Sequence, residues 1–117
     1  MAASPTERTL RLFRKQGYSA GVVEKWIPRV NIRKDLFGFI DIIAVSPAGI
    51  GSIAIQATSY SNMSARRNKI LENDIAIEWL TARNRIILIG WKKKGARWEY
   101  KEEEITLEQF REVELYG

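Results

Sequence analysis

The chain of 117 residues contains no cysteine, no histidine and no apolar run long enough to cross a bilayer. Without cysteine it has no disulfide scaffold and no thiol nucleophile, and without histidine it has no imidazole general base. Any metal ion must therefore be held by oxygen ligands. The start, MAASPTERTLRLF, lacks the apolar segment of a signal peptide, so we expect one cytoplasmic domain over residues 1–117 with no membrane partner.

The net charge of +5 is carried by the first part of the chain. Residues 1–84 hold twelve Lys and Arg against seven Asp and Glu, whereas the remainder holds seven of each sign. Such an excess favours a polyanion, DNA or RNA, as partner, although solvated helix faces are also often basic. The basic clusters are Arg8, Arg11, Arg14 and Lys15; Arg29, Arg33 and Lys34; and Arg66, Arg67 and Lys69.

The first half of the chain reads as a helix followed by strands. The pattern predicts a helix over residues 5–17, a strand over 18–26 and a loop over 27–35. Residues 36–45 and 51–57 are strongly β-forming and are separated by the turn residues SPAG. Because both segments are apolar on two faces, we expect them to pair as central strands of a sheet.

The second half changes to a helical period. Leu71, Ile75 and Trp79 predict one amphipathic helix over residues 64–82. The segment RIILIGW then indicates a buried strand, ARWEYKEEE an exposed one, and TLEQFREVEL a last helix capped by Thr106. The predicted order is α, β, β, β, α, β, with a further strand and helix.

Four tryptophans divide into two expected groups. We expect Trp26, Trp79 and Trp91 to lie in the core. Trp98 stands in a polar segment and is a candidate for an exposed interface, so a homodimer is one expectation.

One acid, Asp41, interrupts the apolar segment FGFIDIIAV, and a buried carboxylate is costly unless it is paired, hydrogen-bonded or bound to a metal. Pairing of the two central strands brings Asp41 near Gln56 and Thr58, which share one face of their strand. Oxygen ligands on adjacent strands suit a hard cation such as Mg²⁺. The alternatives are an ion pair of Asp41 with Arg33 or Arg66, and mutual hydrogen bonding of Gln56 and Thr58.

Four segments resemble the PD-(D/E)XK nuclease superfamily, most of all its small Holliday-junction-resolvase and VRR-NUC branches. They are TERTLRLFRKQGYSAGVVEKW, FIDIIAV, IAIQATS and MSARRNKI, and the likeness in order and spacing covers residues 6–92. The combination of KDLFGFID, QATS and GW also resembles phage proteins. This resemblance implies a restriction-endonuclease-like α/β domain, with an αβββαβ core and a mixed central sheet flanked by helices.

The resemblance implies metal ligands for Mg²⁺ or Mn²⁺. Glu7 in the first helix and Asp41 would be acidic ligands, and the backbone carbonyl of Ala57 would lie between the motif residues. Gln56 stands where the family has an acid, and it would bind through its amide oxygen without adding negative charge. For Glu7 alone, a first-turn acid favoured by the helix dipole is the other interpretation.

The resemblance also places Thr58 where the family has its catalytic lysine. A hydroxyl cannot stabilise the charge that develops on phosphate as an ammonium does, so Lys34 or Lys25 would have to supply it. The candidates for contacts to the nucleic acid, against the alternative of a solvated surface, are Arg33, Lys34, Arg66, Arg67 and Lys69.

Three functions remain open at this point. The first is a metal-dependent DNA endonuclease or resolvase-like phosphodiesterase with an atypical site made of Asp41, Gln56, Thr58 and Lys34. The second is a degenerate nuclease fold that binds DNA, branched DNA or RNA without cutting it. The third is a structural or interaction protein that associates through its sheet and Trp98.

Overall fold

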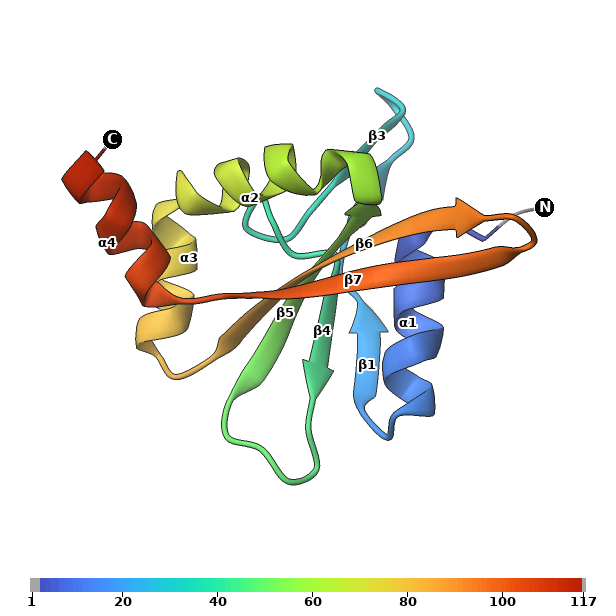
Figure 1. Cartoon of the computed structure of the whole chain (residues 1–117), viewed down its shortest axis with the longest axis horizontal. Helices are drawn as coiled ribbons and strands as arrows, with labels where there is room; N and C mark the ends of the chain where they lie inside the picture. The colour runs from blue at the N-terminus through green and yellow to red at the C-terminus, as the bar shows by residue number, and fades with distance from the viewer. Residues whose placement is uncertain (1–2, 117) are drawn as a thin grey trace.

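The computed structural model describes the backbone of residues 3–116 and the side chains of residues 3–111. It consists of helices packed on a β-sheet (Figure 1). In chain order its elements are α1 (Pro5–Lys15), β1 (Ser19–Val22), β2 (Lys25–Ile27), β3 (Ile32–Lys34), β4 (Ile42–Val45), β5 (Ser52–Ser59), η1 (Tyr60–Asn62), α2 (Met63–Leu71), α3 (Asp74–Thr81), β6 (Arg85–Lys94), β7 (Arg97–Ile105) and α4 (Leu107–Tyr116).

A mixed five-stranded sheet forms the centre, in the order β1-β4-β5-β6-β7. Strands β5 and β6 run parallel, joined through α2 and α3, and the other neighbours are antiparallel. The separate β2–β3 hairpin stands between β1 and β4 in the chain. The predicted mixed sheet flanked by helices is therefore confirmed, with a hairpin inserted into the series of strands.

Helices cover both faces of the sheet, and each face has its own apolar core. Phe13 of α1 packs on one face against Ile42, Ile55 and Ile89. On the other face, helices α2, α3 and α4 contribute Met63, Ile70, Ala76 and Phe110. Alternate residues of β5 therefore enter opposite cores, as a period of two requires, and this places Gln56 on the face of α2.

The segment predicted as a strand over 18–26 and a loop over 27–35 is different in the structure. The strand breaks after Val22, and β2 and β3 then form a short hairpin whose turn includes Asn31 with φ of 55°. Most side chains of this hairpin are exposed, so its sequence carries no burial alternation that would have marked it.

The strand predicted over 36–45 begins only at Ile42. Phe37 and Gly38 have positive φ, 56° and 84°, and they turn the chain so that Leu36 and Ile40 form an isolated bridge. The β-forming residues before Asp41 therefore form a turn rather than a strand. This turn brings the carboxylates of Asp35 and Asp41 close together.

The helix predicted over 64–82 is two helices. Asn73 adopts extended backbone and accepts hydrogen bonds from the backbone N–H groups of Ile75 and Ala76, so it caps α3 and interrupts the run. Ile75, predicted for the apolar stripe, is 39 % exposed because the break rotates the second helix. Thr106 directly precedes α4 as predicted, and its backbone N–H donates to Oε1 of Gln109 at 2.8 Å, which is one of the two hydrogen bonds of a capping box.

The tryptophans follow the prediction in part. Trp91 is buried and Trp79 is partly buried, as expected, and Trp98 is exposed. Trp26, expected in the core, is 49 % exposed instead, because it lies on the hairpin outside the sheet. None of the helices in the described part of the chain has the length and apolar character that a membrane crossing requires.

Candidate metal centre

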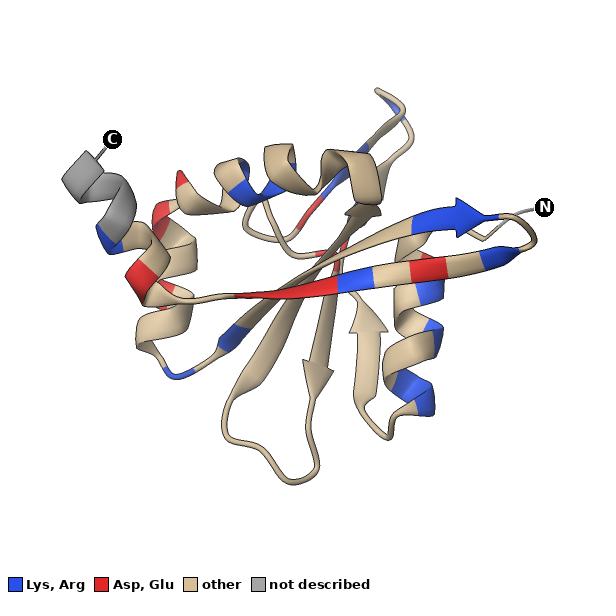
Figure 2. Cartoon of the chain, viewed as in Figure 1, with Lys and Arg blue, Asp and Glu red and all other residues tan. Residues whose placement is uncertain are grey.

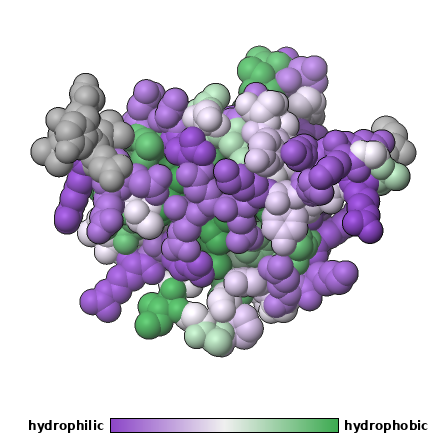
Figure 3. All heavy atoms as spheres, viewed as in Figure 1, coloured by the Kyte–Doolittle hydropathy of each residue, from purple (hydrophilic) through white to green (hydrophobic). Residues whose placement is uncertain are grey.

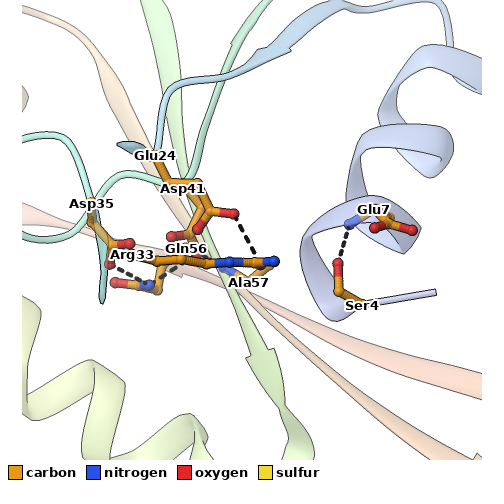
Figure 4. A network of polar contacts seen from close by, with 8 residues as sticks. All are labelled: Ser4, Glu7, Glu24, Arg33, Asp35, Asp41, Gln56 and Ala57. Carbon is orange, nitrogen blue, oxygen red and sulfur yellow. Dashed lines mark hydrogen bonds and ion pairs between the residues drawn. The ribbon is translucent and has the colours of Figure 1, made fainter. Parts of the chain in front are cut away.

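Asp41 lies directly before β4 and is 3 % exposed. The β4–β5 register, Ile42 opposite Ile55, places it beside Gln56. Its Oδ2 accepts a hydrogen bond from Nε2 of Gln56 at 3.0 Å and another from the backbone N–H of Ala57 at 2.8 Å (Figure 4). The predicted proximity of Asp41 and Gln56 is therefore confirmed.

Two further carboxylates join Asp41. Glu24 follows β1 and Asp35 follows β3, and one carboxylate oxygen from each lies within 4.8 Å of one another and of Asp41. Nε2 of Gln56 donates to Asp35 Oδ2 at 3.2 Å as well as to Asp41. The β2–β3 hairpin thus starts and ends at acids of the same cluster, which is how residues distant in the sequence come together.

The crowding of acids changes their titration. Burial, above all, raises the pKa of Asp41 to about 8, and the hydrogen bond with the Asp35 side chain and the charges of Asp35 and Glu24 raise it further, against the N–H of Ala57 that lowers it. Burial also raises the pKa of Glu24, while the charge of Arg33 lowers it and that of Asp35 raises it. A positive charge placed among these groups would favour their ionised forms.

Gln56 is the amide in the centre of this cluster, and its carbonyl oxygen is unsatisfied. The residue is 2 % exposed, and Oε1 is the one buried side-chain nitrogen or oxygen without a hydrogen-bond partner among the described side chains. The opposite amide orientation would set Oε1 against the carboxylates of Asp35 and Asp41, so the observed one is favoured. An orphaned buried oxygen costs about 1–3 kcal/mol. Three carboxylates form a donor set that Mg²⁺ and Mn²⁺ prefer, so the residues present fit such an ion, and Gln56 would join them as a ligand only after rotation of its amide brings Oε1 in place of Nε2.

A cavity of about 320 Å³ opens beside the cluster. Its wall combines the acids with positive side chains from the hairpin and from α2. The lining residues are Thr6, Glu24, Arg33, Lys34, Asp35, Gly38, Asp41, Gln56, Ala57, Arg66 and Lys69. Arg33 also forms an ion pair with Glu24 at 3.5 Å. The cavity therefore has carboxylates that can hold a metal ion and, around them, cations that can bind an anion. This charge arrangement suits a phosphate bound to a metal ion.

The structure brings together most of the predicted site residues. Asp41, Gln56, Ala57 and Lys34 all line the cavity. Thr58 is buried in β5 at 5 % exposure, and it is absent from the lining given by the described residues. The two alternatives for the buried polar groups are not observed, since Arg33 pairs with Glu24 and the Gln56 amide N–H groups go to carboxylates.

Glu7 lies apart from the cluster. It is exposed on the first turn of α1, where its backbone N–H donates to Ser4 Oγ at 3.2 Å, and Figure 4 shows it away from the other acids. Its place in the acidic set is occupied by Glu24. Among the described residues, Lys25 is outside the cavity lining as well.

The predicted nucleic-acid contacts divide into two groups. Arg33, Lys34, Arg66 and Lys69 line the cavity, and all but Arg33 are outside the ion pairs found among the described side chains. Arg67 instead forms a bidentate ion pair with Glu103 of β7, with a shortest contact of 2.6 Å. The hydrogen bonds to Glu103 raise the pKa of the Arg67 guanidinium. The guanidinium therefore ties α2 to the sheet.

Sequence reasoning missed Glu24 and Asp35. The sequence pattern places Asp35 at the end of the loop predicted over 27–35 and Glu24 inside the strand predicted over 18–26. The two acids do flank one segment, residues 25–34, which the structure forms into a hairpin. That position brings them together only if the segment folds back on itself, and the sequence pattern does not predict this fold. No family model, curated protein or solved structure matches the chain, so membership of the nuclease superfamily stays a prediction.

Proposed function

We propose that this protein is a Mg²⁺- or Mn²⁺-dependent phosphodiesterase that cuts DNA, with a restriction-endonuclease-like fold of the resolvase-like kind. The observation that carries the proposal is the convergence of the Glu24, Asp35 and Asp41 carboxylates, whose oxygens lie within 4.8 Å of one another, on the wall of a cavity that Arg33, Lys34, Arg66 and Lys69 also line. Carboxylates held this close repel one another when ionised, and a divalent cation bound among them offsets that repulsion.

In this proposal Asp41 is the central ligand and Glu24 and Asp35 are flanking acids, and Gln56 becomes a neutral ligand when its amide rotates to present Oε1 to the cation. The N–H of Ala57 holds Asp41 in place through its 2.8 Å hydrogen bond. When bound, a divalent cation polarises a phosphoryl oxygen and lowers the pKa of its water ligand. Hydrolysis adds the water oxygen to phosphorus and breaks one phosphorus–oxygen ester bond, leaving a phosphomonoester and a free hydroxyl.

Lys34 and Lys69 are the candidates for the missing motif lysine. Both line the cavity, from β3 and α2 respectively, and both are outside the ion pairs of the described side chains. An ammonium on the cavity wall stabilises negative charge that develops on the phosphoryl oxygens. Arg66 belongs to the same wall and serves as a contact to a neighbouring phosphate.

The second candidate function, nucleic-acid binding without cleavage, is favoured by one specific feature. Thr58 replaces the motif lysine and is buried, so β5 itself carries no cation into the cavity. Self-association through Trp98 is less favoured, because the guanidinium of Arg8 already covers its ring at 3.7 Å from the centroid.

A cleavage assay separates these functions. Wild type, Asp41→Asn and the matched control Asp74→Asn, which changes an exposed aspartate at the start of α3, are incubated with linear, nicked, branched and single-stranded DNA and with RNA in Mn²⁺ or Mg²⁺. We expect cleavage by wild type and control and none by Asp41→Asn. Binding without cleavage by all three proteins would support the second function and contradict the first.

A further inference from the structure

A second cavity of about 290 Å³ adjoins the first. The two share Thr6, Glu24 and Arg33, so they are separated by a wall of side chains only. The second one lies between the start of α1, the end of β1 and the β2–β3 hairpin. Its lining residues are Ser4, Thr6, Glu7, Val22, Glu24, Trp26 and Arg33.

Trp26 is the unusual member of this lining. It is 49 % exposed, although a tryptophan placed for stability alone would bury its indole in one of the two cores. The hairpin register sets it directly opposite Arg33, so the two side chains share one face. Figure 3 shows apolar atoms at the top of the view, where the hairpin lies, and the exposed apolar residues of this segment include Val30 and Ile32.

The two cavities differ in charge. The first has cations from β3 and α2 in its wall, which suits a phosphate. Among the described residues that line the second, Arg33 is the one cation, Glu7 and Glu24 are acids, and Trp26 and Val22 form the apolar side. A phosphate is disfavoured beside two carboxylates, whereas a flat aromatic ring with polar edges stacks on an indole and bonds to such groups.

We infer that the second cavity is a nucleobase pocket in which Trp26 stacks on a base next to the scissile phosphate. The inference rests on the proposed function and adds a substrate class to it. Bases inside a duplex are stacked on their neighbours and cannot reach a protein ring without leaving the helix. The preferred substrate is therefore a nucleic acid with an unpaired nucleotide at the cut, such as a single strand, a flap or a branch.

The test measures binding rather than cutting. Fluorescence anisotropy is recorded with a labelled single-stranded oligonucleotide and with the same sequence as a full duplex, with Ca²⁺ in place of Mg²⁺. The variants are Trp26→Ala, Trp26→Phe and, as matched control, Trp98→Ala, which removes the other half-exposed tryptophan, 42 % exposed and packed under Arg8. Thermal melting of each variant shows that it is folded.

We expect Trp26→Ala to weaken single-strand binding about 5- to 150-fold, the range that corresponds to about 1–3 kcal/mol for one stacked base, and to change duplex binding less than about twofold. Trp26→Phe should recover most of the loss because it keeps an aromatic face. The inference would be overturned if Trp98→Ala lost as much affinity as Trp26→Ala, or if Trp26→Ala lost as much affinity for the duplex as for the single strand. If the wild type does not cleave DNA, the proposed phosphodiesterase activity is refuted, but a preference for single strands that depends on Trp26 would still be measured. The failure of the proposed function and the failure of the pocket are therefore distinguishable.

Discussion

Replacement of Asp41 by asparagine tests the charge state of the cluster most directly. Without a bound cation, burial holds the pKa of Asp41 at about 8 in the folded protein, against an ordinary value of 3.8. Between these values the folded state binds a proton that the unfolded state releases. The contribution of Asp41 to stability is therefore fully present below about pH 4 and is lost as the pH rises to about 8, at about 1.4 kcal/mol per pH unit.

The variant Asp41→Asn is neutral at every pH and can keep the hydrogen-bond pattern. Its side-chain oxygen replaces Oδ2 as acceptor for the N–H groups of Gln56 and Ala57, and its amide can donate to Asp35. In metal-free buffer at pH 7, about three pH units above the unfolded pKa, we expect the free energy of unfolding to rise by up to about 4 kcal/mol. At pH 4 the two proteins should be nearly equal in stability.

A bound cation should reduce this advantage. Mn²⁺ at a hundred times its dissociation constant stabilises a folded protein by about 2.7 kcal/mol. We expect this gain for wild type and none for Asp41→Asn. Urea unfolding from pH 4 to pH 8, with EDTA and then with Mn²⁺, measures both effects, with Asp74→Asn as control. Parallel pH profiles for wild type and Asp41→Asn, or equal Mn²⁺ shifts, would refute the reasoning.

Three other predictions concern the surroundings of the cluster. Arg66→Gln with Lys69→Gln should lower the slope of log affinity for duplex DNA against log salt by about 1.8, since each phosphate contact contributes about 0.9, and anisotropy titrations in rising salt measure it. Gln56→Glu adds a carboxylate to three others, so it should destabilise the metal-free protein and tighten Mn²⁺ binding, as calorimetry would show. Gly90→Ala should cost about 1–3 kcal/mol in urea unfolding, because the added Cβ meets Met63 in the core.

Each of these three has an outcome that contradicts it. Arg111→Gln with Arg83→Asn removes two exposed cations away from the cavity, and an equal change of salt slope there would mean that only net charge matters. Asparagine suits position 83, where φ is 68°. Weaker Mn²⁺ binding by Gln56→Glu would place the cation outside the cluster. A fully stable Gly90→Ala protein would mean that α2 shifts away from the sheet without cost.

The distribution of charge shows how the paired and unpaired cations are arranged. In Figure 2 the outer side of α1 and the ends of β6 and β7 are rich in basic residues, and acids follow them along β7. Arg67 and Arg85 are paired with Glu103 and Glu104 of that strand, whereas the cavity cations from β3 and α2 have no such partners among the described side chains. The acids of β7 therefore neutralise cations of α2 and β6 and leave those of the cavity wall available to a nucleic acid.

The sequence alone determined the centre of the fold. The apolar residues of β4, β5 and β6 alternate into two cores, and this two-faced burial is a local pattern that any central strand must show. It also determined that Asp41 and Gln56 are neighbours, because a hairpin closed by SPAG sets the register of its strands. The local pattern therefore suffices to predict a buried acid next to a buried amide.

The tertiary structure decided the composition of the cluster. Glu24 and Asp35 reach Asp41 because β2 and β3 fold into a hairpin and because the turn at Phe37 and Gly38 reverses the chain. These conformations depend on positive φ values and on exposed strands, which leave no periodic pattern in the sequence. Whether Glu7 or Glu24 joins the acids is a matter of where α1 packs on the sheet. Packing of distant segments, which no local pattern encodes, selected Glu24.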